Sequence, residues 1–341
     1  MGDRTGFKRL LAGLLTISSS VSATEPAPAA QYDGPVIDVH LHADSAAQNG
    51  PPGQSICPLE GPLADIQFDA SDEWRQALIE RGFNPPCENP LVGASTDQAL
   101  RDETIAEMRR YNVRGLVSGP SEYLRDWADA APDFFWPATK FYLPSNTAPT
   151  PEQVTSAKQR NETFALAEIV NQYAGLAPGD PRMDPYWKMA EREQLPVGIH
   201  IGLGPPGAVA LYPEFRAMSP LELDPVLKRF PRLRIFAMHA GYPYLEDMKA
   251  MLYLYPQLMV ETGVLQFQIP RAEYYAYLEG LVRAGFADRI MFGSDQMNWP
   301  AAIGEGVRAI NAAPFLNYEQ KKAILHDNAA RFLRVEGGIP G

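Results

Sequence analysis

The stretch VIDVHLHAD, residues 36–44, decides the fold class that we expect for this chain. It is an apolar, β-branched run, and His40 and His42 stand near its end. Because successive side chains of a strand point to opposite faces, the two histidines share one face, and the apolar residues beside them occupy the other. Two imidazoles on one face can bind one ion. The stretch therefore predicts a buried strand that ends at a metal site.

Seven further apolar runs alternate with amphipathic stretches, which is the pattern of a parallel sheet covered by helices. The predicted strands are Val36–Ala43, Gly115–Ser118, Phe135–Tyr142, Ala165–Val170, Pro196–Ile201, Arg234–Ala240, Leu258–Thr262 and Ile290–Ser294. The predicted helices are one capped by Ser95 and ending at Arg110, then Glu122–Ala130, Pro151–Arg160, Pro185–Gln194, Pro220–Phe230, Tyr244–Tyr255, Arg271–Ala284 and Tyr318–Arg334. No low-complexity linker interrupts residues 32–337, so we predict an α/β fold in which this region is a single (β/α)8 TIM barrel.

The long Pro/Gly-rich segment 45–93 is predicted to be an insertion after the first strand, forming a loop or a cap. It contains both cysteines of the chain, Cys57 and Cys87. In an oxidising compartment, a single disulfide is the natural expectation. Closing a loop of about 30 residues would stabilise the fold by about 3–4 kcal/mol. Two unpaired buried thiols are the alternative.

Residues 1–23 have the composition of a secretory signal peptide. Three basic residues precede the short apolar run 10–17, and small residues lead to a cleavage site after Ala23. Residues 24–31 then form a proline-rich extended lead-in. We expect a periplasmic or secreted protein with no membrane association after cleavage, because the apolar run is far shorter than the roughly 20 residues that span a bilayer. An uncleaved amphipathic anchor is the alternative.

The composition excludes several function classes. The 341 residues are 45% hydrophobic and 21% charged, which excludes a disordered or fibrous chain. Thirty basic against 41 acidic residues give a net charge of −11, and the sequence has no cluster of Lys and Arg to bind a phosphate backbone. We therefore expect a small-molecule substrate rather than a nucleic acid, and a homo-oligomer is a possible assembly.

Polar side chains with metal-binding chemistry end several predicted strands. Four of the five histidines do so, and an aspartate follows the last strand. The residues are His40, His42, His200, His239 and Asp295. In a (β/α)8 barrel the carboxyl ends of the strands meet at one mouth, so these side chains are expected to converge. Imidazoles with one carboxylate suit Zn²⁺ or a similar divalent ion and leave a position open for water or substrate.

Four separated motifs, VIDVHLHAD, GIHIG, MHAG and FGSD, follow one another in this order. With them, the sequence resembles the amidohydrolase superfamily over residues 36–334. The stretch QYAGLAPGDPRMDPYWKMAEREQLPVGIHIG, residues 172–202, narrows the resemblance to the amidohydrolase-related branch that contains aminocarboxymuconate semialdehyde decarboxylase.

The resemblance implies a division of roles among the polar residues. The implied metal ligands are His40, His42, His200 and Asp295. His239 would stand beside the bound water as acid and base, and Asp295 would share the base role. One divalent ion, most simply Zn²⁺, accounts for this set, and a second ion is possible.

Other residues are candidates for supporting roles. Glu168, on the fourth predicted strand, would hold a second ion or orient a histidine, and Asp38 would be buried support. Lys140 would pair with a substrate carboxylate or be a solvated strand end. Three residues are candidates to line the pocket or to pack: Asn298, Trp299 and Tyr242. His326, in the terminal helix, is expected to be structural.

The leading hypothesis for function is an exported metal-dependent hydrolase that cleaves an amide, ester or lactone bond of a small molecule with a metal-activated water. Export favours hydrolysis, because water is the only co-reactant. The alternative is a metal-dependent, non-oxidative decarboxylase of a small unsaturated or aromatic acid. A catalytically idle metal or ligand binder is a third hypothesis, against which the intact acid/base candidate argues.

Overall fold

The structure is a computed structural model that describes residues 1–2, 30–62, 69 and 73–335. The predicted signal peptide, beyond its first two residues, and most of the predicted lead-in lie outside the described residues. Within the described ranges, no helix combines the length and the apolar character that crossing a bilayer requires.

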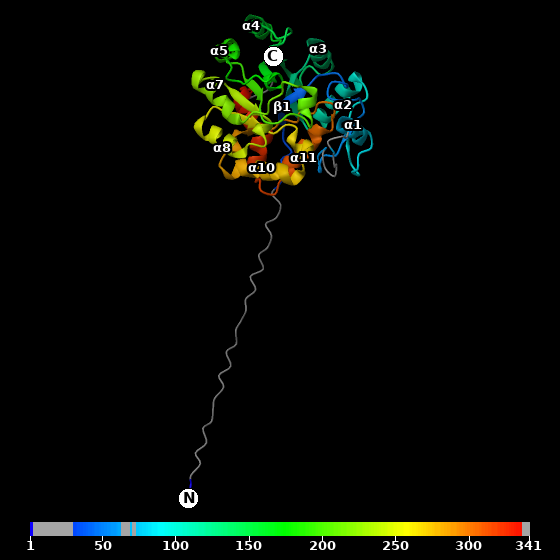
Figure 1. Ribbon diagram of the computed structural model, residues 1–341, viewed down its shortest axis with the longest axis vertical. Helices are drawn as coiled ribbons and strands as arrows, with labels where there is room; N and C mark the ends of the chain where they lie inside the picture. Colours follow the sequence, from blue (N-terminus) through cyan, green and yellow to red (C-terminus); the bar gives the residue numbers. More distant parts are fainter. Residues whose placement is uncertain (3–29, 63–68, 70–72, 336–341) are drawn as a thin grey trace.

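Eight parallel strands form the centre of the protein. They are β1 (Val36–His42), β4 (Val113–Ser118), β5 (Phe135–Phe141), β6 (Ala165–Ile169), β7 (Val197–His200), β8 (Ile235–Met238), β9 (Met259–Glu261) and β10 (Ile290–Met291), and they pair in this order. The sheet closes because the Val39 N–H donates to the Phe292 carbonyl (3.0 Å) and the Asp295 N–H donates to the His40 carbonyl (2.8 Å). The predicted barrel is confirmed, and Figure 1 shows the helices arranged in a ring around it.

The late strands are shorter than their apolar runs predict. β8 stops at Met238 and β10 at Met291, whereas the runs continue to Ala240 and Ser294. The backbone turns after each strand: His239 has a φ of 56° and Asp295 a φ of 51°, in the left-handed region that residues other than glycine seldom adopt. Both residues thereby leave the sheet at the end where the functional side chains gather.

Helices cover the outside of the sheet. Those that alternate with strands or follow the last one are α2 (Asp97–Arg110), α3 (Ser121–Ala130), α4 (Pro151–Gln159), α5 (Asp184–Glu193), α6 (Ala208–Leu211), α7 (Asp224–Arg229), α8 (Leu245–Leu254), α9 (Leu265–Gln268), α10 (Arg271–Arg283), α11 (Ala302–Ala312), α12 (Tyr318–Lys322) and α13 (Asn328–Leu333). The main apolar core joins them to the strands, with Leu166 of β6, Trp187 of α5 and Tyr274 of α10 among its buried members.

One predicted helix begins at a different residue, and one helix was not predicted. The helix predicted to be capped by Ser95 begins at Asp97, because the Thr96 side chain accepts from the Ala99 N–H (3.1 Å). The sequence analysis also missed α11, whose two glycines lower helix propensity. Close packing explains why both positions are glycine. A Cβ on Gly304 would lie 2.4 Å from the Tyr111 ring, and one on Gly306 would lie 2.8 Å from the Phe292 ring.

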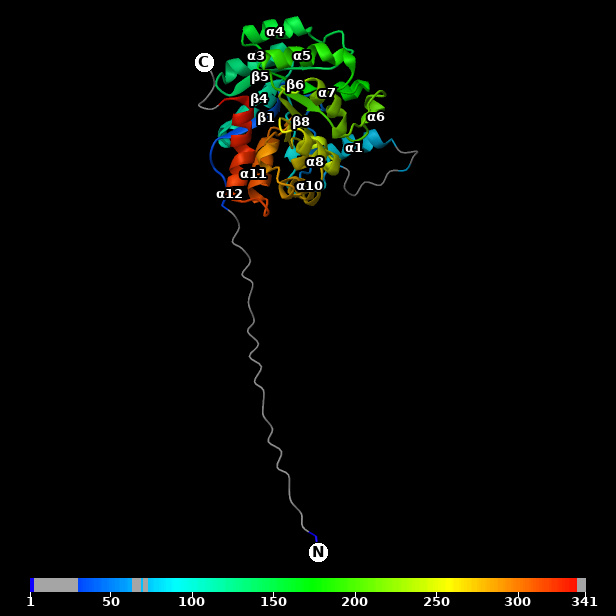
Figure 2. The same cartoon turned by 90° about the vertical axis from the view of Figure 1, so that its left-hand side faces the viewer.

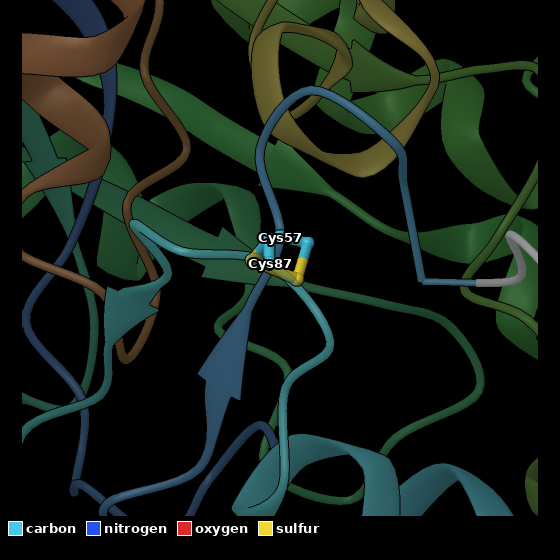
Figure 3. The surroundings of a disulfide bond; sticks show 2 residues. All are labelled: Cys57 and Cys87. Atoms are coloured by element: carbon cyan, nitrogen blue, oxygen red, sulfur yellow. A yellow bond between two sulfur atoms is a disulfide. The ribbon is translucent and has the colours of Figure 1, made fainter.

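The segment between β1 and α2 has more regular structure than a loop. It contains β2 (Ser55–Ile56), α1 (Trp74–Phe83) and β3 (Leu91–Val92), with β2 and β3 paired antiparallel. Cys57 and Cys87 form a disulfide (Figure 3), so the predicted pairing is confirmed. Their Cα atoms are 5.9 Å apart. That the segment is an insertion stays a prediction.

This disulfide-bonded segment packs against loops at the carboxyl ends of the strands. The Trp299 indole N–H donates to the Gln54 carbonyl (2.7 Å), and the Ala94 N–H donates to the Asn298 carbonyl (2.8 Å). Trp74 of α1 packs against Gly207, just before α6, and Figure 2 shows α1 and α6 at the same end of the protein. The segment thus borders the barrel mouth.

Candidate metal centre

Six buried ionisable side chains converge at the carboxyl ends of the barrel strands. They are His40 and His42 at the end of β1, Glu168 in β6, His200 at the end of β7, His239 just after β8 and Asp295 just after β10. The structure therefore brings together every residue that the sequence predicts as a metal ligand or as an acid/base group. Glu168 lies between the others.

His40, His42 and Asp295 form a compact group, which we call the first side. The Nε2 atoms of His40 and His42 are 3.1 Å apart. Asp295 Oδ1 lies 3.0 Å from His42 Nε2 and 3.6 Å from His40 Nε2. Ligand atoms that bind one ion at about 2.1 Å are separated by about 3.0–3.4 Å. Asp295 Oδ1 is also buried without a hydrogen-bond partner among the described residues, so this donor set fits a divalent cation.

His200 and His239 form the second side, and Glu168 separates it from the first. Glu168 Oε2 faces the first side, 4.0 Å from His40 Nε2 and 3.8 Å from His42 Nε2. Glu168 Oε1 faces the second side, 3.7 Å from the Nε2 atom of both His200 and His239. One carboxylate thus presents its two oxygens to two different pairs of imidazoles, and each pair with Glu168 is a group that could hold an ion.

Glu261, at the end of β9, is a site residue that sequence analysis missed. Its Oε1 atom lies 3.1 Å from His40 Nδ1 and accepts from the backbone N–H of His239 (2.8 Å), while Oε2 accepts from the Gly263 N–H. Both oxygens therefore have protein partners, which favours an orienting role over a ligand role. Its position at the end of a strand could have identified it, because the histidines were identified by the same feature.

Gln296 holds His42 in place through the backbone. Its side-chain carbonyl accepts from the His42 N–H (3.0 Å), and its amide donates to the His42 carbonyl (2.6 Å). Asp38 links β1 to the segment after β10, because its Oδ1 atom accepts from the N–H groups of His40 (2.9 Å) and Ser294 (3.0 Å). The first side is thus tied together across the closure between β1 and the chain after β10.

Lys140 lies inside the site, not at a solvated strand end. Its Nζ atom is 3.7 Å from both Asp44 Oδ2 and Glu168 Oε2, and 3.3 Å from His42 Nδ1. Burial lowers the pKa of Lys140, but the charges of Glu168 and Asp44 outweigh burial and raise it. The ammonium therefore stays charged beside the first side.

His40 on the first side and His200 on the second have opposite protonation. Burial lowers the pKa of His40, but Asp295 and then Glu261 outweigh it and raise that pKa to about 10. Burial, followed by the charge of His239, lowers the pKa of His200 to about 3. For His239, burial lowers the pKa, but the hydrogen bond with Glu168 and the charge of Glu261 outweigh burial and raise it. Burial raises the pKa of Asp295, but His40 and His42 hold it below its usual range. The first side thus carries a proton that a cation would replace, whereas His200 is neutral.

The remaining candidates contact residues other than the six. Trp299 and Asn298 hold the disulfide-bonded segment, as described above, and the Tyr242 hydroxyl donates to Glu273 of α10 (3.5 Å). His326 lies in the π-helical stretch Ala323–Asp327, which joins α12 to α13, and its Nδ1 atom is 2.8 Å from Asp327 Oδ1. No contact of His326 with the six residues occurs in the described ranges, in keeping with a structural role.

A model of the amidohydrolase family matches residues 37–335. The chain belongs to the amidohydrolase family. It is therefore a metal-dependent enzyme of that superfamily, and the buried cluster of histidines and carboxylates is its candidate metal centre. A search of curated proteins finds no match.

Solved structures with a similar fold span both reactions considered above. An uncharacterized TIM-barrel protein from Bordetella bronchiseptica is 20% identical, with a TM-score of 0.58, over 88% of this chain and 98% of that one. A probable 2-pyrone-4,6-dicarboxylic acid hydrolase from Acinetobacter baumannii is 14% identical, with a TM-score of 0.56, over 88% of this chain and 99% of that one. A 5-carboxyvanillate decarboxylase from Novosphingobium aromaticivorans with bound manganese is 13% identical (TM-score 0.55; 88% and 97% covered). At these identities the likeness shows the barrel fold.

Proposed function

We propose that the protein is a metal-dependent hydrolase that cleaves an ester, lactone or amide bond of a small molecule. The observation that carries the proposal is the placement of Glu168, whose two oxygens face two separate pairs of imidazoles. A carboxylate shared between two cation subsites is a recurring arrangement of hydrolytic two-metal centres. A decarboxylation needs one cation to hold its substrate and makes no use of a second.

The two subsites use different residues. The first side, with Glu168 Oε2, would hold the resident cation. His200 Nε2, with Glu168 Oε1, would hold a second and weaker one. Cations there would lower the pKa of a bound water toward about 7 and polarise the substrate carbonyl. Zn²⁺ suits the donor set, and Mn²⁺ is the ion that the decarboxylase of similar fold contains.

His239 is suited to move the proton. Its Nδ1 atom lies 3.0 Å from the Gly263 carbonyl, which only accepts, so Nδ1 carries the hydrogen. Nε2 faces Glu168 Oε1, and although burial lowers the pKa of His239, the hydrogen bond with Glu168 raises it. His239 would take a proton from the attacking water and return it to the leaving group. Asp295, held ionised, would share this role from the first side.

Export is part of the proposal. The disulfide between Cys57 and Cys87 supports an oxidising compartment, and the basic and apolar start of the sequence supports secretion to the periplasm or beyond it. A small-molecule substrate fits a site that is buried at the end of a barrel and bordered by the disulfide-bonded segment.

Decarboxylation is the second candidate, and Lys140 is the observation that favours it. A charged ammonium 3.7 Å from Glu168 Oε2 can hold a carboxylate beside the resident cation. His239 would then protonate the carbon that loses carbon dioxide. A lactone or ester that also bears a carboxylate would use Lys140 equally well, so Lys140 does not outweigh the shared position of Glu168.

One experiment separates these functions. The purified protein is stripped of metal, reloaded with Zn²⁺ or Mn²⁺, and assayed against panels of lactones, esters and amides, while carbon dioxide release is followed on aromatic acids. We expect hydrolysis and up to two ions per chain by elemental analysis. Carbon dioxide release with one ion would establish the decarboxylase instead. Bound metal without turnover in any panel would indicate a binder.

A further inference from the structure

Tyr173 places a phenol hydroxyl at the second side of the site. It lies in the 3-10 turn Asn171–Ala174, which follows β6. Its hydroxyl oxygen lies 3.4 Å from His200 Nε2, and its ring meets the His200 ring edge-on with centroids 5.2 Å apart. Sequence analysis did not single out Tyr173, because a tyrosine in a turn has no metal-ligand chemistry.

The hydroxyl has one partner among the described residues, and that partner has a competing task. His200 Nε2 has a single lone pair, which either accepts from Tyr173 or binds a cation. When His200 serves as a ligand, the hydroxyl loses its acceptor while remaining next to the reacting groups. A phenol is protonated at neutral pH, so the hydroxyl has a hydrogen to donate.

The ring cannot easily turn away to find another acceptor. Tyr212 packs edge-on against it with centroids 4.7 Å apart, and Phe215 does so at 5.3 Å. The His200 ring occupies a further side. A hydroxyl held in this way is oriented before substrate arrives, which is the condition under which a single donor contributes most to catalysis.

We propose that Tyr173 is a further catalytic residue, which donates a hydrogen bond from its hydroxyl to the substrate carbonyl oxygen as negative charge develops there. No bond to the phenol proton breaks: the hydrogen stays on Tyr173 and the hydrogen bond strengthens as the carbonyl carbon becomes tetrahedral. This inference rests on the proposed hydrolysis, since it is this reaction that places an oxyanion at the site.

The test compares Tyr173→Phe with the unaltered protein and with Tyr186→Phe. Tyr186 is a matched control, because its buried hydroxyl donates to the Pro149 carbonyl (2.9 Å) outside the site. We expect Tyr173→Phe to keep its metal content and its melting temperature. Its kcat for the best ester or lactone should fall about 100-fold, with KM changed less than threefold. Tyr186→Phe should keep both kinetic constants.

A binding measurement makes the test independent of turnover. Methylphosphonate, a tetrahedral anion, is titrated calorimetrically into the metal-loaded proteins. We expect Tyr173→Phe to bind it about tenfold more weakly than the unaltered protein and Tyr186→Phe to bind it equally well. Equal affinity in Tyr173→Phe, or no binding to the unaltered protein, would overturn the inference. Absence of hydrolysis together with weakened binding in Tyr173→Phe would refute the proposed reaction while retaining Tyr173 as the oxyanion donor.

Discussion

The two sides of the metal centre use the same kind of ligand but are constrained to different degrees. On the first side, His40 Nδ1 is held by Glu261 at 3.1 Å, and Gln296 clamps the backbone of His42. On the second side, His239 Nδ1 lies 3.0 Å from the Gly263 carbonyl, but His200 Nδ1 is buried without a hydrogen-bond partner among the described residues, and its Nε2 atom faces Tyr173. A histidine binds a cation more tightly when its other ring nitrogen, which faces away from the cation, is held by a hydrogen bond. The first side is therefore suited to retain an ion, and His200 on the second side is suited to exchange partners.

The largest expected effect comes from breaking the first side. His42→Ala removes the imidazole nearest to Asp295 Oδ1. We expect metal and activity to be lost together, with kcat/KM falling at least about 1,000-fold because the cation supplies most of the activation of water. Elemental analysis beside kinetics checks this. A His42→Ala protein that retains stoichiometric metal would show that the first side is not the resident site.

His239→Ala tests the division of roles across the two sides. We expect it to keep the ion of the first side and to lose turnover by about 100- to 10,000-fold, because it removes the proposed proton carrier but no ligand of the resident cation. Metal content and kcat are measured on the same preparation. A metal-free His239→Ala protein would mean that ligand and base have been confused.

Glu261→Gln reduces the constraint on the first side without removing a ligand. We expect the affinity for the resident cation to fall about 10- to 100-fold, because the amide is a weaker acceptor for the ring hydrogen of His40. At saturating metal, kcat should change much less. Competition with a chelator gives the affinity, and unchanged affinity would assign Glu261 to packing alone.

The protonation of His40 and of His200 predicts how the affinity for each of the two cations depends on pH. The pKa of His40, raised to about 10 by Asp295 and Glu261 against burial, means that the ring is protonated at pH 6–8 without metal. A cation must displace that proton, so affinity for the first ion should rise about tenfold per pH unit in this range. The pKa of His200, lowered to about 3, implies no such slope for the second ion. Calorimetry in buffers of different ionisation enthalpy measures both, and equal slopes would contradict the assignment.

Removing the disulfide is expected to have the smallest effect on the two sides of the metal centre. Replacing Cys57 and Cys87 together by Ser should lower the free energy of unfolding by about 3–4 kcal/mol through the loss of the cross-link. Metal content should not change, because both cysteines lie outside the six-residue cluster. Urea unfolding and elemental analysis check the two statements, and a loss of metal would show that the segment bordering the mouth supports the ligands.

Much of the site was predictable because its residues obey strand geometry. His40 and His42 share a face, and His200, His239 and Asp295 stand at strand ends, where a barrel gathers its side chains. Glu261, which obeys the same rule at the end of β9, was missed. Helix α11 was missed because glycine signals a break, whereas here it admits the rings of Tyr111 and Phe292.

The sequence by itself determined the barrel, the residue types that gather at its mouth and the one pairing open to its cysteines, because these follow from local periodicity and from there being two cysteines. The tertiary structure alone decided which oxygen of Glu168 faces which histidines and where the hydroxyl of Tyr173 lies. It also decided which imidazoles have a hydrogen-bond partner at the ring nitrogen that faces away from the site. Such contacts join residues at least 24 positions apart. Their geometry depends on strand register and on the turns after β8 and β10, which no local pattern encodes.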